Sequence, residues 1–290
     1  MLWIPITVAA TGLQVARNAL QRGLLTGAGP WGASLVRFLY GLPFSLLFFG
    51  LAWALSPHAH PRLSLGFFLA CAIGGGAQIL ATASMLVSMR RSSFALGTVF
   101  QQSGIPLAAL FGLALGEHLG VAKWSGLALA TSGLMWLGWP RGRERDWSAA
   151  GLGLLAGAGF AVAGNAFRQA ALSLDRADPL LTAQLTVFVG QTMQSAALIA
   201  WLALTDRGAL RIAVTSWRAS VPAGFFGAAA SGLWFTAFAM TPVGLVRAVG
   251  VIEMPIAAFA GRRMFAERLA PWQIAAAMVT ALGVGLAALA

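Results

Sequence analysis

Long apolar runs, separated by charged residues, proline and glycine, follow one another along the chain. They lie at 3–22, 31–54, 64–88, 94–115, 120–139, 148–171, 179–204, 216–240, 244–264 and 270–289. A helix of about 20 residues crosses the roughly 30 Å hydrocarbon core of a bilayer. The pattern therefore predicts an all-α integral membrane protein with ten transmembrane helices and short connections.

Composition supports a membrane protein and argues against nucleic acid as a partner. Of the 290 residues, 59% are hydrophobic and only 9% are charged, whereas a soluble domain carries about 25% charged residues. The net charge of +11 comes mostly from basic residues beside the apolar runs, where such residues orient helices in the bilayer. Tryptophans gather near the ends of the runs, as expected at a membrane interface, and Trp234 is the exception inside one.

The even number of predicted spans places both termini on the same side of the membrane. Connections on the opposite side carry more arginines, among them Arg90, Arg91, Arg141, Arg143 and Arg145. By the positive-inside rule, that side faces the cytoplasm and the termini face outward. The expected location is the inner membrane of a bacterial cell.

The two halves of the chain repeat at a spacing of about 150 positions, as in many transporters. Segment 12–19 matches segment 159–166, which brings Asn18 into register with Asn165. Because five helices per half is an odd number, the second half must cross the membrane in the opposite sense. The predicted fold is two inverted five-helix repeats, divided into 1–139, a connecting loop at 140–147, and 148–290.

A proline followed by a glutamate recurs in both halves. Glu253 and Pro255 lead to Glu267, and Pro106 leads to Glu117 in a weaker first copy. With the ten short-looped spans, this pattern resembles the drug/metabolite transporter superfamily, specifically its EamA-type exporters, over the whole chain. The resemblance implies a central cavity formed mainly by helices 1, 3, 4, 6, 8 and 9, and export of amino acids, aromatic ones in particular. It also implies cytoplasmic termini, contrary to the charge count.

Polar side chains inside a span are costly unless they pair or face a cavity, so they mark a candidate site. Asn18 and Asn165 are suited to hydrogen-bond the zwitterionic end of an amino acid, and Trp234 and Phe238 offer an aromatic face. The alternatives are hydrogen bonds between helices for the amides and plain packing for the aromatic rings. The candidate cavity residues are Gln14, Asn18, Gln78, Thr82, Met85, Gln101, Asn165, Gln169, Ser231, Trp234 and Phe238.

Glu253 is the acidic residue that lies well inside a predicted span. It is suited to bind a substrate ammonium or to carry a proton, with Arg17 as a candidate charge partner, while a structural ion pair is the alternative. Pro106 and Pro255 each remove a backbone donor in the middle of a predicted helix and are therefore candidate hinges.

The sequence predicts no enzyme, no cofactor and no metal site. All histidines and aspartates lie at or beyond the ends of the predicted spans. The sequence contains no His-Glu-x-x-His metal motif. It also offers no pair of intramembrane carboxylates for acid–base catalysis. A phosphate-binding Gly-x-x-x-x-Gly-Lys-Ser loop is missing as well, which excludes nucleotide hydrolysis within this chain as an energy source.

The leading hypothesis is a transporter that exports amino acids and related small metabolites by alternating access, either facilitated or ion-coupled. A drug, nucleotide-sugar or sugar-phosphate transporter of the same fold is the first alternative, although arginines scattered near span ends argue against a phosphate. A membrane scaffold or receptor is an alternative of another class. The expected partners are a small-molecule substrate and the lipid bilayer, and a monomer is compatible with these patterns.

Overall fold

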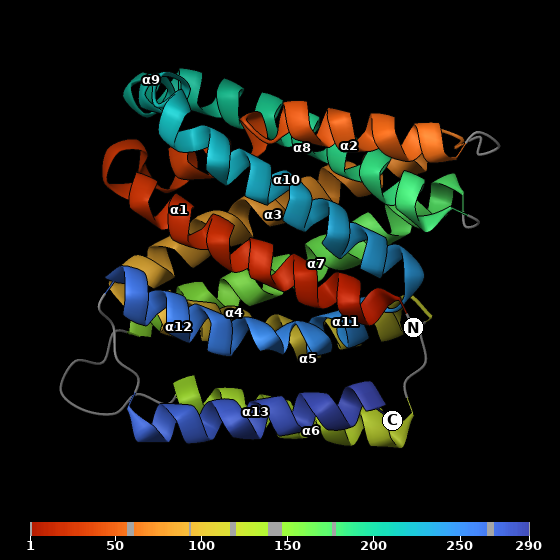
Figure 1. The fold of residues 1–290 in the computed structure, drawn as a ribbon, viewed down its shortest axis with the longest axis vertical. Helices are drawn as coiled ribbons and strands as arrows, with labels where there is room; N and C mark the ends of the chain where they lie inside the picture. Colours follow the sequence, from red (N-terminus) through yellow and green to blue (C-terminus); the bar gives the residue numbers. More distant parts are fainter. Residues whose placement is uncertain are drawn as a thin grey trace. The chain divides into compact units, whose positions relative to one another are not determined.

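The computed structural model describes residues 2–56, 61–92, 94–116, 120–138, 147–175, 178–265 and 270–289. Every regular element in these ranges is a helix (Figure 1). Five helical segments are long and apolar enough to cross a membrane, namely Gly27–Leu55, Leu65–Arg91, Trp147–Leu174, Pro179–Thr205 and Trp217–Met240. The chain is therefore an all-α protein that crosses a membrane several times.

Helices occupy each of the predicted apolar runs. They are α1 (Trp3–Leu39), α2 (Leu42–Leu55), α3 (Leu65–Arg91), α4 (Phe94–Gln101), α5 (Gly104–Ala114), α6 (Val121–Gly138), α7 (Trp147–Leu174), α8 (Pro179–Thr205), α9 (Arg207–Thr215), α10 (Trp217–Met240), α11 (Val243–Val249), α12 (Glu253–Phe265) and α13 (Pro271–Leu289), with a 3₁₀ helix, η1 (Gly250–Ile252), between α11 and α12. Where the helices differ from the predicted runs, the differences have local causes.

A sharp turn divides α1 into two arms. Gly29 has a φ of 65°, a value that only glycine adopts readily, and Pro30 begins the second arm. The first arm continues to Ala28, well past the predicted end of the first span at residue 22. Arg17, which the sequence places near a span end, therefore lies in the middle of a helical arm.

The predicted fourth and ninth spans are both interrupted. The fourth consists of α4 and α5, and the ninth consists of α11, η1 and α12. Pro106 and Pro255 are each the third residue of the helix that follows the break. A proline in the first turn lacks only an N–H that has no intrahelical partner there, so neither proline kinks the helix that contains it. Each lies just after the break within its predicted span. The breaks themselves lie before the prolines.

The short helix α9 is the element that the apolar pattern did not predict. Ala209 is buried, whereas Arg207 and Arg211 are exposed, and the Asp206 carboxylate caps the helix by accepting from the Ala209 N–H at 2.9 Å. Nine residues with two arginines resemble a connection in sequence. Such an amphipathic helix is typical of the membrane interface.

The chain divides into two compact units, each built from segments of both predicted repeats. Unit 1 comprises Met1–Ile79 and Ala163–Thr241, and unit 2 comprises Leu80–Val162 and Pro242–Ala290. Helices α3 and α7 contribute one part to each unit. The units and the predicted repeats are therefore different divisions of the same chain.

Unit 1 is organised around the pairing of α1 with α10, which run past each other over much of their length (Figure 1). Helix α2 packs against α8, and α9 packs against the first helix. The core between them includes Leu35, Phe38, Leu198 and Ala223, all buried. This packing places the inner face of α10 against both arms of α1.

Unit 2 contains a tightly packed pair, α6 and α13, which lie side by side (Figure 1). A Cβ added at Gly126 would overlap the backbone N of Ala287, and one added at Gly283 would overlap that of Ala130. Only glycine lets the two backbones approach this closely. In the same unit α4 packs against α12 and α5 packs against α11.

Candidate functional site

Two buried arginines of unit 1 contact the same glycine. Arg17, on the first arm of α1, is 2% exposed, and Arg37, on the second arm, is 1% exposed. A Cβ added at Gly227 of α10 would lie 3.0 Å from Arg37 Cγ and 3.5 Å from Arg17 Cδ. The aliphatic parts of both side chains therefore pass against the bare backbone of α10.

The turn in α1 explains how these two residues meet. Gln21 Nε2 donates to the carbonyl oxygen of Ala33 at 2.9 Å, across 12 positions of sequence. In a straight helix that separation would span about 18 Å. The arms consequently fold back on each other at Gly29, and Arg17 and Arg37 come to face the same stretch of α10.

Neutral oxygens of neighbouring side chains accept hydrogen bonds from both guanidinium groups. Arg17 donates through Nε and Nη2 to Asn18 Oδ1, at 3.1 and 2.6 Å. Arg37 Nη2 donates to Ser231 Oγ at 3.3 Å. We refer to Arg17, Asn18, Arg37, Gly227 and Ser231 as the arginine cluster. Because a guanidinium presents five donors in one plane, it is able to bind a carboxylate or phosphate with two hydrogen bonds at once.

An aromatic cluster follows on the same side of α10. Its members are Phe167 of α7 and Trp234, Phe235 and Phe238 of α10. The ring centres of Phe167 and Phe235 lie 4.4 Å apart, and those of Trp234 and Phe238 lie 5.7 Å apart. Ser231 precedes Trp234 and Phe235 by three and four positions, so it shares their helix face. One face of α10 thus carries a hydroxyl that accepts from Arg37 and then a buried aromatic surface.

Helix α8 contributes three buried glutamines that were not among the predicted site residues: Gln184, Gln191 and Gln194. Gln194 Nε2 donates to Gln78 Oε1 at 2.8 Å and to the Gly75 carbonyl at 3.2 Å. Within the described part of the chain, neither amide atom of Gln191 has a hydrogen-bond partner. The three glutamines are separated by seven and three positions, which places them on one helix face. Polar side chains inside a predicted span marked Asn18 as a candidate, and the same argument would have marked these glutamines.

In the described part of unit 2, the buried Glu253 carboxylate lies in a network of amides. Glu253 is 1% exposed. Gln101 Nε2 lies 2.9 Å from both carboxylate oxygens, and Gln102 Nε2 donates to Oε2 at 3.0 Å. The Arg247 guanidinium also interacts electrostatically with Glu253. Arg17, predicted as a charge partner of Glu253, belongs to the other unit.

The other predicted residues have different surroundings. Gln14 and Asn165 are buried in unit 1, at 6% and 3% exposed, and Thr82 and Met85 are fully buried in unit 2. Gln169, predicted to share a cavity face with Asn165, is exposed. Its neighbour Arg168 turns toward the end of α10, where Nη1 donates to the carbonyl oxygens of Phe238 and Thr241.

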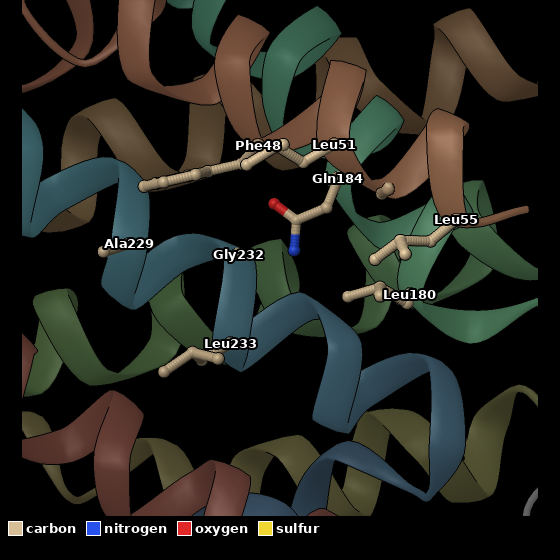
Figure 2. A pocket seen from close by; sticks show the side chains of 9 residues that line it. Phe48, Leu51, Leu55, Leu180, Gln184, Ala229, Gly232 and Leu233 are labelled. Carbon is tan, nitrogen blue, oxygen red and sulfur yellow. The ribbon is translucent and has the colours of Figure 1, made fainter.

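A pocket of about 290 Å³ lies between α2, α8 and α10 in unit 1. Figure 2 shows the Gln184 amide projecting into it, between Phe48 and Leu51 of α2 and Gly232 of α10. It is lined by Phe48, Leu51, Ala52, Leu55, Leu180, Gln184, Ala229, Gly232 and Leu233. None of these residues carries a charge.

Comparison with known proteins yields a fold. No family model and no curated protein matches the chain. Among solved structures 27 chains match, including a crystal structure described only as that of a protein, with a TM-score of 0.66 and 13% sequence identity over 100% of this chain and 98% of that chain. At this level of identity the similarity indicates a shared fold and does not extend to function.

Proposed function

We propose that this chain is a bacterial inner-membrane transporter of the EamA-type drug/metabolite transporters, which exports amino acids and related small metabolites by alternating access. The observation that carries the proposal is the arginine cluster beside the aromatic cluster on one face of α10. Guanidinium groups bind the carboxylate of an amino acid, and the rings accommodate an apolar or aromatic side chain. Charged groups among apolar membrane helices usually have such a function.

Ten crossings in two inverted repeats are part of the proposal, and the pairing of α6 with α13 supports them. Added Cβ atoms place Gly126 against Gly283 and Gly133 against Ala276, so the two helices run antiparallel. At the repeat spacing of about 150 positions, Gly126 corresponds to Ala276 and Gly133 corresponds to Gly283. The two pairs are therefore equivalent contacts in the two repeats. Corresponding helices that run in opposite directions are what inverted repeats require.

The interrupted helices support the same arrangement. Helix α4 packs against α12, and α5 packs against α11. At the repeat spacing, α4 corresponds to α11 and α5 corresponds to α12, so these two contacts are equivalent in the two repeats. Broken helices near the middle of a membrane are a common feature of transporters built from inverted repeats.

The candidate residues divide into separate roles. Arg17 and Arg37 bind the substrate carboxylate, Ser231 orients Arg37, and Asn18 orients Arg17. Trp234 and Phe238 contact the substrate side chain. We assign no catalytic step, cofactor or metal to the chain.

Transport of an organic phosphate is the second candidate, favoured by one observation. The expectation that the arginines are scattered does not fit Arg17 and Arg37, which contact the same glycine while both buried. Two cations at one place are suited to a sugar phosphate or a nucleotide sugar. The adjacent aromatic cluster ranks the amino acid first.

Purified protein in liposomes preloaded with a labelled substrate tests both candidates. Phenylalanine and glutamate serve as an aromatic and an acidic amino acid, and glucose 6-phosphate serves as the organic phosphate. We expect efflux of phenylalanine above that of protein-free liposomes. Efflux of the phosphate alone would favour the second candidate. If no labelled compound leaves faster than from empty liposomes, transport is wrong, and a membrane scaffold or receptor becomes the better hypothesis.

A further inference from the structure

The pocket between α2, α8 and α10 has apolar walls that reach the surface of the protein. Leu51 and Leu55 are 55% and 76% exposed, and Leu180 is 39% exposed. Exposed leucines on membrane helices face the hydrocarbon of the bilayer. The pocket is therefore accessible to a molecule that is dissolved in the lipid.

One polar group points into this apolar space. Gln184 is 6% exposed, and its amide lies among the lining side chains (Figure 2). The Thr236 hydroxyl donates to the Gly232 carbonyl oxygen at 2.8 Å, so it is left to accept from Gln184 Nε2, which lies 3.5 Å away. This contact favours the amide orientation in which Nε2 faces Thr236. Gln184 Oε1 has no hydrogen-bond partner among the described residues.

A buried acceptor without a donor is unfavourable. Gln184 Oε1 is buried against Gly232, so a ligand that supplies the donor must turn the Gln184 amide toward itself. Gly232 faces the amide directly, because an added Cβ would lie 2.7 Å from Gln184 Oε1. A cavity of 290 Å³ accommodates about ten water-sized groups. The ligand that fits is small, carries one hydrogen-bond donor, and has no charge, since no charged residue lines the pocket.

The depth of Gln184 also matches an amphiphile. Gln184 is the sixth residue of α8, which places it about 8 Å from the start of the helix. Leu55, the last residue of α2, lines the same pocket. The polar group therefore lies near one end of these helices, on the level where lipid tails meet headgroups.

We propose that this pocket binds a small uncharged amphiphile from the lipid phase, whose hydroxyl donates to Gln184 Oε1 and whose apolar body lies against Phe48, Leu51 and Leu180. Ala229, Gly232 and Leu233 lie on the opposite face of α10 from Ser231 and Trp234. The site is thus separate from the arginine cluster, and the inference stands whether or not the proposed transport is correct.

The test uses the full chain in phospholipid nanodiscs and a photoreactive n-decanol that carries a diazirine at the far end of its chain. Labelled peptides are identified by mass spectrometry. Unlabelled n-decanol competes against methyl nonyl ether, which has the same number of non-hydrogen atoms and no donor. We expect labelling of segments 48–55, 180–184 and 229–233, and competition by the alcohol at an about fivefold lower mole fraction than by the ether.

Two variants separate the hydrogen bond from the pocket. Gln184→Met preserves side-chain length without the acceptor and should make the alcohol and the ether equally effective competitors. Leu55→Trp fills the exposed mouth and should reduce labelling of all three segments without disturbing the core. Thr192→Val changes an exposed hydroxyl on the same helix and should leave labelling and competition unchanged.

Two results would overturn the inference. One is labelling spread evenly over the exposed apolar faces of the helices, with no concentration at the three segments. The other is equal competition by alcohol and ether in the unchanged protein, which would mean that the groove only accommodates lipid tails. Because Leu55 is largely exposed, loss of folding would not explain reduced labelling in Leu55→Trp, and a thermal unfolding curve verifies this.

Discussion

Unit 1 and unit 2 both bury ionisable groups among apolar helices, but they surround them differently. In unit 2 the Glu253 carboxylate accepts three amide hydrogen bonds from Gln101 and Gln102, which join the end of α4 to the start of α12. In unit 1 the Arg17 and Arg37 side chains lie against the bare backbone of Gly227. Asn18 and Ser231, which are neutral, accept from them.

The difference separates a structural charge from a candidate binding charge. A carboxylate that accepts several amide hydrogen bonds and also interacts with the Arg247 guanidinium ties together the helices that carry those groups. A guanidinium is able to bind a carboxylate with two charge-assisted hydrogen bonds, which are about twice as strong as hydrogen bonds between neutral groups. The comparison therefore predicts that transport is sensitive to changes in the arginine cluster, and that stability is sensitive to changes at Glu253.

The largest effect is expected from removing the Arg37 charge. Arg37→Met keeps much of the buried volume and loses the guanidinium, so efflux per folded protein should fall by about a hundredfold, the equivalent of about 3 kcal/mol in substrate binding. Arg37→Lys keeps the charge without the planar fork and should be intermediate. The measurement is phenylalanine efflux from liposomes. Undiminished efflux by Arg37→Met would remove the cluster from the transport path.

A smaller effect should follow from adding one methyl group at Gly227. In Gly227→Ala the new Cβ lies 3.0 Å from Arg37 Cγ, which displaces the side chain, and we expect an about tenfold loss of efflux. Gly50→Ala on α2 is the matched control, because nothing lies within 4 Å of its added Cβ. If both variants transport at the same rate, the close packing of Arg37 against α10 does not contribute to transport.

More modest losses are expected where neutral groups contribute. Asn18→Ala and Trp234→Ala should each lower efflux by about fivefold, because Asn18 acts on the substrate only by orienting Arg17 and Trp234 supplies one aromatic contact. Trp201→Ala changes an exposed tryptophan on α8 and controls for losing an indole. Both variants should elute as folded protein in size-exclusion chromatography, and wild-type rates in both would place the substrate elsewhere.

The smallest effect on transport is expected at Glu253. Glu253→Gln replaces an acceptor with a donor that faces the donors of Gln101 or Gln102, so the free energy of unfolding should fall by about 1–3 kcal/mol. Efflux per folded protein should change by less than about twofold on the same scale. Thermal unfolding and efflux are measured on one preparation. A tenfold loss of efflux with unchanged stability would make Glu253 a transport residue and reverse the comparison.

The helices were predictable because a bilayer forces the backbone to satisfy its own hydrogen bonds over long apolar runs. The short helix α9 was missed, since its arginines interrupt the apolar pattern. The first span was predicted to end at residue 22, whereas the first arm of α1 continues to the turn made by Gly29.

Contacts between distant residues lay beyond the sequence pattern. Gln101 and Glu253 are 152 positions apart, and local spacing carries no information on which helices will meet. The face formed by Ser231, Trp234 and Phe238 was predicted, since these residues lie within one helix. Gln184, which lies in the pocket, follows the same helical periodicity as Gln191 and was recognisable by that rule alone.

The turn at Gly29 also bears on how the protein is made. A single residue separates the two arms of α1, so they leave the ribosome almost together and are suited to enter the membrane as one hairpin. Arg37, however, donates to Ser231, which is synthesised 194 positions later. For most of translation the two arginines must therefore remain without the helix that encloses them. Completion of this cluster is a late, non-local step in folding, and such steps are slow.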